Sequence, residues 1–450
     1  MDERQRMMKV IKAFLIILFL NPFMLFSQET PLSNDYESVP LRFYSYSIFD
    51  GTLDSFTMRQ MDLNYFATSR LINRGVEEIF ADKTFLKIKV SDWINYTWPT
   101  FVYAITHEEG HRSILTAQNI GSISQPFFNL HGAAYVKGVT DQTLINLRDT
   151  KKDSFIRMYT AGIESDYMMS KRGEMFAAFD LDSFSILYPD YLFRRMMICG
   201  YLCTGIIYHG AEEIGGLYNW ITGLMNLTEE KDELARDICG FDTFGATKAL
   251  FEDNYQFRRY VQYSDLSKEE KNFLVWRVGY RSYLNFLSLF LFTKPYINIT
   301  ESFSVSGSVG YALAPFGDFI DENLYFRFKT ESAGSLNFYL YARQAQNYKN
   351  WFPSFGLGII EFAPFSWLSI SSQTHIWWQP EKLNFYSTSS FFGGAFEITG
   401  KFFLTNKDWK TPLQKIGLST SLLVKSKGFM PEIEQHDKYL RFSLGIEIGF

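Results

Sequence analysis

The sequence predicts an α+β protein in which a mainly helical region precedes a set of antiparallel strands. Apolar residues recur at helical spacing over long segments between residues 93 and 292. From residue 293 onward the chain changes to short, aromatic-rich segments with alternating polarity, separated by turn residues. Aromatic residues make up 18% of the chain, which is high for a sequence of modest overall hydrophobicity. This combination favours strands that bury apolar residues by alternation rather than in long runs.

The N-terminus has the layout of a secretory signal peptide. Four basic residues precede the apolar run Ala13–Phe26, and we place the end of the signal at residue 27. The run is too short and too interrupted for a comfortable membrane span, and no stretch of about 20 apolar residues follows it. We therefore expect a signal peptide (1–27), a linker with a small β region (28–92), a helical domain (93–292) and a strand domain (293–450).

The most informative motif in the helical region is His107-Glu108-Glu109-Gly110-His111, an HExxH pattern. With six His in the chain, roughly 0.004 such matches are expected by chance. The surrounding sequence predicts a helix over about 100–118, which places both imidazoles on one face, one turn apart. The pair can then bind one metal ion while Glu108 reaches a metal-bound water. The alternative is a helix whose His pair is satisfied by hydrogen bonds alone.

The motif resembles that of the zincin metallopeptidases, although the resemblance covers one helix and perhaps a second. It implies that His107 and His111 bind Zn²⁺ and that Glu108 is the general base. A third protein ligand would leave the fourth zinc position to water, whose pKa the metal lowers towards ~7.

The third ligand must come from elsewhere in the chain. The extended pattern HExxHxxGxxH is absent, because Ile114 and Ala117 occupy the positions of its Gly and third His, and the inverted HxxEH pattern is absent too. The remaining arrangement is gluzincin-like, with a Glu from a later helix. Glu164 is the best candidate, on a helix predicted over about 153–179. A carboxylate on such a small, apolar face is costly unless it is paired or metal-bound.

Several alternatives for the site stay open at this stage. The Asp that often follows the gluzincin Glu by four residues is replaced by Met168. Other candidates for the third ligand are Asp166, His131, and Glu212 or Glu213. His209 is a candidate catalytic residue that would stabilise an oxyanion, although a polar helix end explains it equally well. The small residues Ala161 and Gly162 would let the Glu164 helix approach the His helix closely.

The second strong feature is the C-terminal segment Tyr439–Phe450, which alternates strictly. One face is apolar, and the other carries residues such as Arg441, Ser443 and Glu447. That pattern fits a strand with one face toward lipid. The terminal Phe450 resembles the sorting signal of Gram-negative outer-membrane barrels. The alternative is an amphipathic strand in a soluble sandwich.

Seven earlier segments have similar strand character. With the last strand they predict a small antiparallel transmembrane β-barrel of about eight strands. Leu41–Phe49 and Phe85–Val90 could add strands. The eight predicted segments are Ile297–Val309, Asn323–Thr330, Ser335–Arg343, Phe355–Phe362, Trp367–Trp378, Ala395–Leu404, Ile416–Val424 and Tyr439–Phe450.

Together these features predict an outer-membrane-tethered zinc metalloendopeptidase that cleaves protein or peptide substrates. Its further partners would be outer-membrane lipid and the barrel assembly machinery, and a net charge of −5 gives no indication of nucleic-acid binding. Because both ends of an even-stranded barrel face the periplasm, we expect the helical domain on the periplasmic side. The competing hypothesis is a non-enzymatic outer-membrane barrel with a helical plug and a structural or vestigial metal site.

Overall fold

The computed structural model describes residues 42–450, apart from 53–54, 80–91, 126–133, 215–230, 254, 293–294, 331–333 and 406–414. The predicted signal peptide and the segment Phe85–Val90 lie outside the described residues. One compact unit contains the described parts of Arg42–His209 and Asn226–Phe450. Of the other unit, Met1–Leu41 with Gly210–Met225, the structure describes only 210–214, the end of a helix.

Helices dominate the described chain up to residue 292. The helix predicted over 153–179 is confirmed, whereas the one predicted over 100–118 is divided in two near Tyr103. No helix in the described ranges is both long and apolar enough to cross a bilayer. The helices are α2 (Met58–Ile79), α4 (Asp92–Val102), α5 (Ala104–Ala117), α6 (Asp141–Thr150), α7 (Lys152–Ala178), α8 (Phe184–Leu202), α9 (Thr204–Ile214), α11 (Asp242–Phe251) and α12 (Lys268–Asn272), with shorter turns η2 (Tyr263–Asp265), η3 (Phe273–Gly279), η4 (Ser282–Phe286), η5 (Leu289–Phe292) and η6 (Glu381–Leu383).

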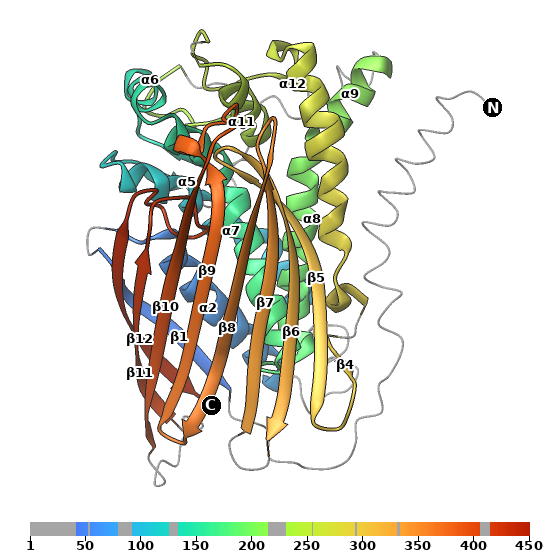
Figure 1. Ribbon diagram of the computed structural model, residues 1–450, viewed down its shortest axis with the longest axis vertical. Coiled ribbons are helices and arrows are strands. Elements are labelled where there is room, and N and C mark those ends of the chain that lie inside the picture. The colour runs from blue at the N-terminus through green and yellow to red at the C-terminus, as the bar shows by residue number, and fades with distance from the viewer. Residues whose placement is uncertain are drawn as a thin grey trace, which may run out of the picture. The chain divides into compact units, whose positions relative to one another are not determined.

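The expected α+β class is confirmed, and the C-terminal strands form one large antiparallel sheet (Figure 1). All eight predicted segments overlap observed strands. The sheet has ten strands rather than about eight, because β1 from the N-terminal region and the short β4 join it. Its order is β1-β12-β11-β10-β9-β8-β7-β6-β5-β4, so β1 and β4 are edges and the described sheet is not a closed barrel. The strands are β1 (Phe43–Asp50), β4 (Ile297–Asn298), β5 (Phe303–Ala314), β6 (Gly317–Thr330), β7 (Gly334–Gln346), β8 (Trp351–Phe365), β9 (Leu368–Pro380), β10 (Ser390–Thr405), β11 (Lys415–Lys425) and β12 (Tyr439–Gly449); β2 (Ile123–Gln125) and β3 (Tyr135–Lys137) pair separately.

The predicted alternation determines which face of the sheet is covered. In β12, Leu440 and Phe442 are exposed while Arg441 is 1% exposed. The polar face of the sheet packs against α2 and α7 (Figure 1). At this contact the hydroxyl of Tyr167 on α7 donates to Asp321 on β6. The interior between sheet and helices therefore contains buried charges, and the outward face is apolar, which is the reverse of an ordinary soluble sheet.

Near each edge of the sheet, an asparagine side chain from a helical element pairs with the backbone of one strand residue. On β1, the Asn64 carboxamide accepts from the Ser47 N–H at 2.7 Å and donates to the Ser47 carbonyl at 3.0 Å. On β5, beyond the short β4, Asn285 accepts from the Tyr311 N–H at 3.0 Å and donates to its carbonyl at 2.9 Å. Each amide thus replaces a peptide group of a missing neighbouring strand. Such capping satisfies backbone groups that an open edge would leave unpaired.

Replacing Asn285 with Ala will destabilise the fold markedly. The variant leaves the buried N–H and carbonyl of Tyr311 without this partner, at about 1–3 kcal/mol per unsatisfied group. We expect a clear drop in the midpoint of denaturant unfolding of the purified protein. Asn146→Ala, on the exposed surface of α6, is the matched control and will leave the midpoint unchanged. Equal midpoints for the two variants would show that the Asn285 cap contributes nothing.

Candidate metal centre

The two helices that build the site cross at a pair of glycines. A Cβ on Gly110 of α5 would lie 2.5 Å from the carbonyl oxygen of Ala161 on α7. A Cβ on Gly162 of α7 would lie 2.5 Å from the Nε2 atoms of both His107 and His111. The expectation that small residues let these helices approach closely is therefore confirmed, and the absent Gly162 side chain leaves space at the imidazoles.

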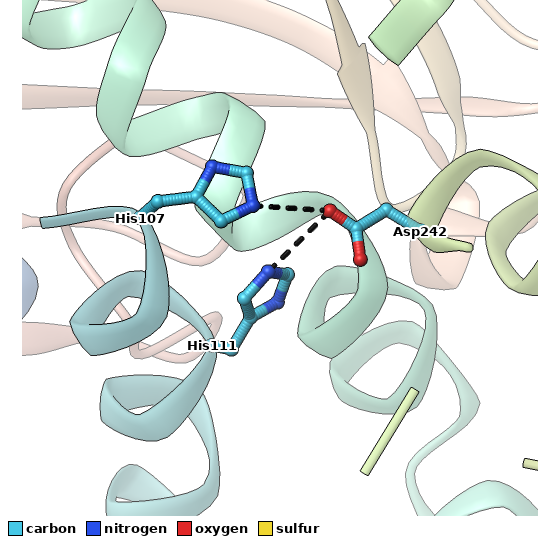
Figure 2. Close-up of side chains that lie close together, drawn as sticks. All are labelled: His107, His111 and Asp242. Atoms are coloured by element: carbon cyan, nitrogen blue, oxygen red, sulfur yellow. Dashed lines mark hydrogen bonds and ion pairs between the residues drawn. The ribbon is translucent and has the colours of Figure 1, made fainter. Parts of the chain in front are cut away.

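A third helix brings a carboxylate to the two imidazoles. Asp242 lies in the first turn of α11, which packs on α7 through Gly245, where a Cβ would clash with the Tyr159 ring. The Asp242 Oδ2 atom is 3.2 Å from His107 Nε2 and 3.5 Å from His111 Nε2 (Figure 2). The HExxH pair is thus completed from a segment more than a hundred residues away.

The three side chains fit a metal ion. The ligand atoms of His107, His111 and Asp242 all lie within 4.8 Å of one another, and all three residues are buried. Two donors bound to tetrahedral zinc at about 2.0–2.1 Å lie ~3.3 Å apart, which agrees with the two nitrogen–oxygen distances. The Asp242 carboxylate also accepts from the Cys239 thiol at 3.4 Å. This group of residues could therefore bind a metal ion.

Neighbouring groups orient both imidazoles through their other nitrogen. His107 Nδ1 hydrogen-bonds Asp166 Oδ2 at 2.8 Å, and His111 Nδ1 hydrogen-bonds the Met158 carbonyl at 2.5 Å. Both acceptors lie on α7, and a proton on each Nδ1 leaves each Nε2 lone pair free toward Asp242. Such support is typical of metal-binding histidines. Asp166 is in turn held by Arg194 of α8, whose Nη1 donates to it at 2.6 Å.

The electrostatics of the site favour a bound cation. Burial raises the pKa of Glu108 to about 7, against the opposing effect of the two imidazoles. Burial also opposes ionisation of Asp242, but His111 and His107 outweigh it and lower the pKa of Asp242. Burial disfavours protonated His107, but the carboxylates of Asp166 and Asp242 prevail and raise its pKa. Several acids thus surround the imidazoles, and positive charge between them is stabilised.

Glu164, expected as the third ligand, does not lie with the two imidazoles. Its carboxylate accepts from Arg157 Nη2 at 2.6 Å and Nε at 3.0 Å, and from the Glu432 N–H at 2.8 Å. The buried charge is therefore neutralised by a bidentate guanidinium rather than by a metal. Sequence reasoning considered neighbours three and four residues away, whereas Arg157 lies seven residues away, two turns along the same face.

The other candidates from the sequence take different positions. Asp166, considered as a ligand, instead supports His107. His209 is partly exposed on α9 and is not in the group of converging ligand atoms. His131 lies outside the described residues, and so do the side chains of Glu212 and Glu213.

Sequence reasoning missed two residues of the site. Asp242 begins a helix, where an acid is readily explained by the helix dipole, so it carried no distinct signal. Tyr201 on α8 stacks on the His107 ring, with centroids 4.9 Å apart and an interplanar angle of 18°. Neither residue has a local spacing relation to the HExxH motif, and only packing brings them together.

Asp166→Asn will weaken metal binding without removing a ligand. The neutral amide orients His107 less strongly, and loss of such a partner typically costs 10–100-fold in metal affinity. Competition with a chromophoric chelator measures the change. Asp190→Asn is the matched control, because Asp190 also accepts from Arg194 but does not contact the imidazole. Equal losses of metal affinity in both variants would mean that the loss arises from the disturbed Arg194 side chain rather than from the orientation of His107.

No known protein family, curated protein or solved structure matches this chain.

Proposed function

We propose that this protein is a zinc metallopeptidase held in the outer membrane of a Gram-negative bacterium. The observation that carries the peptidase proposal is the convergence of His107, His111 and Asp242 beside Glu108. Two imidazole nitrogens and one carboxylate oxygen form a donor set that suits Zn²⁺ and leaves a position for water.

The residues of the site have distinct roles in this proposal. A zinc ion bound there would supply Lewis acidity and a water of lowered pKa. Glu108 accepts the proton of the attacking water and then delivers it to the leaving amine of the substrate. Its burial brings its pKa to about 7, close to that of an effective general base. His209 and Tyr201 are candidates to stabilise the oxyanion, and we favour Tyr201 because its ring contacts His107.

The outer-membrane location is supported by the polarity of the sheet. Its outward side chains, among them Leu340, Phe396 and Leu418, are exposed and apolar, while the opposite face carries charged groups. A sheet with this polarity suits a position in which its apolar face contacts the hydrocarbon of a membrane. The two asparagine caps pair the backbone groups of Ser47 and Tyr311, each of which would cost several kcal/mol if left unpaired in a bilayer. Lipid and the barrel assembly machinery are the corresponding partners.

Protein or peptide chains are the proposed substrates, and a membrane tether raises their effective concentration near the site. The decisive experiment is the zinc stoichiometry of the purified full-length protein together with hydrolysis of an unfolded protein substrate. We expect one zinc per chain and chelator-sensitive cleavage. Protein that binds no zinc after incubation with the metal would refute the proposal.

A second candidate, a structural metal site in a non-enzymatic membrane protein, is favoured by the burial of the site. His107 and His111 are each 2% exposed and Glu108 is 7% exposed. The thiol of Cys239 next to Asp242 could supply a fourth ligand and close the site. X-ray absorption separates the two, because a zinc–sulfur distance of about 2.3 Å indicates the closed site. An all-nitrogen/oxygen shell supports the peptidase.

A further inference from the structure

We propose that the metal centre faces the cell exterior and acts on peptide segments presented there. This inference rests on the proposed outer-membrane location. It replaces the expectation of a periplasmic site, which came from the position of the two ends of an even-stranded barrel rather than from the packing of the helices on the sheet.

The first residues of β1 and the last residues of β12 lie at the same side of the sheet. The Arg42 N–H donates to the Phe450 carbonyl at 3.1 Å, and the Phe450 N–H donates to the Arg42 carbonyl at 3.2 Å. Strands β12 and β11 pair there as Gly449 with Lys415, and at the opposite end as Tyr439 with Lys425. We call these the chain-end side and the far side of the sheet. The connections 347–350, 381–389 and 426–438 all lie on the far side.

The far-side connection 426–438 packs directly on the part of α7 that supports the metal ligands. The carbonyl of Ile433 accepts from Arg157 at 2.6 Å, and His436 contacts Asp153 at 2.6 Å. Between these contacts and Asp166 lie Met158 and Gly162, which touch the two imidazoles. The site therefore lies toward the far side.

Contacts with a far-side connection also place α11, the helix that carries Asp242, toward the far side. Phe251, at the end of α11, packs on Phe385 with ring centroids 5.0 Å apart. Its carbonyl accepts from the Tyr386 hydroxyl at 3.2 Å. Both partners lie in the far-side connection 381–389. Figure 1 shows α5 and α11 toward the end of the sheet away from the C-terminus.

The C-terminal end of α7 lies at the chain-end side of the sheet. Asp180, just after α7, accepts from Arg327 at 3.1 Å, and its carbonyl accepts from Arg42 at 2.7 Å. Arg42 belongs to the chain-end side. Helix α7 therefore runs from the far side to the chain-end side, and its first half holds the site.

The direction of insertion assigns the two sides to compartments. A sheet assembled from the periplasm moves its hairpin connections across the membrane, whereas both chain ends stay on the side from which they entered. Outer-membrane sheets accordingly have short periplasmic turns and longer exterior loops. Among the described connections between neighbouring strands, the longest, 426–438, is on the far side, and the two-residue turn 366–367 is on the chain-end side. The far side, with the metal centre, is then the exterior.

Single cysteines on the two sides test this orientation in intact cells. Lys349→Cys lies in the far-side connection 347–350 and Ser366→Cys in the turn 366–367, and both positions are exposed. The unmodified protein, whose Cys199, Cys203 and Cys239 are buried, gives the background. With a membrane-impermeant maleimide, we expect K349C to label in intact cells. We expect S366C to stay unlabelled in intact cells and to become labelled once the outer membrane is permeabilised.

The outcomes separate this inference from the proposed function. The reverse pattern, with S366C labelled in intact cells and K349C protected, would overturn the exterior orientation and leave an outer-membrane peptidase. Equal labelling of both positions, either in intact cells or only after permeabilisation, would mean that the sheet does not separate two compartments. That result would overturn both the orientation and the membrane location, while zinc stoichiometry would still report on the metal site.

Discussion

Glu108→Gln will retain bound zinc and lose nearly all hydrolysis. The amide is nearly isosteric with the carboxylate but cannot accept a proton from water, and general-base catalysis typically contributes about 10²–10⁴-fold. We expect kcat for an unfolded protein substrate to fall by that factor, with KM nearly unchanged. Metal content measured on the same sample will equal that of the unmodified protein, because the ligands are untouched.

Glu109→Gln is the matched control for this variant. Glu109 is the adjacent residue of the motif, but its carboxylate pairs with Arg112 outside the ligand group. Its replacement removes the same charge from the same helix and will leave kcat close to that of the unmodified protein. Full activity in Glu108→Gln would remove Glu108 from the mechanism, and equal losses in both variants would point to a general effect of charge.

Asp242→Ala will lose the metal. The variant removes one of the three proposed protein ligands, so we expect its effect on metal affinity to exceed the roughly 10–100-fold expected for an orienting residue. It also leaves the imidazoles without the carboxylate that they contact at 3.2 and 3.5 Å. We expect the purified variant to contain little zinc, and chelator competition to place its affinity far below that of Asp166→Asn.

The pair Asp242→Asn and Glu164→Gln tests which buried acid is the ligand. Both changes neutralise a carboxylate and preserve its shape. Asp242→Asn will weaken zinc binding, whereas Glu164→Gln will keep zinc and lower the unfolding midpoint, because Arg157 becomes a buried charge without its counter-ion. Zinc loss in Glu164→Gln with zinc retained in Asp242→Asn would restore the original assignment of Glu164.

Local patterns in the sequence predicted what depends on local geometry. The spacing of His107 and His111 places both on one helical face because of the 3.6-residue repeat, and the structure has them there. Helix α7 and the alternating strand β12 follow from the same kind of periodicity. These features need only the conformation of a single element, which side-chain order along the chain specifies.

Relations between distant elements required the tertiary structure. Glu164 looked like a ligand because a buried carboxylate needs a positive partner, but packing supplied Arg157 to it and left Asp242 facing the imidazoles. The asparagine caps near the sheet edges could not be predicted from the sequence either, because Asn64 and Asn285 cap strands only through their placement beside β1 and β5.

By itself, then, the sequence determined the α+β class, the two-histidine face and the polarity of each strand. Only the tertiary structure decided which carboxylate joins the two imidazoles, the open ten-stranded sheet and the end of the sheet at which the candidate metal centre lies. The physical reason is that periodicity specifies which face of an element is apolar, whereas the partner of a buried charge depends on how separate elements pack.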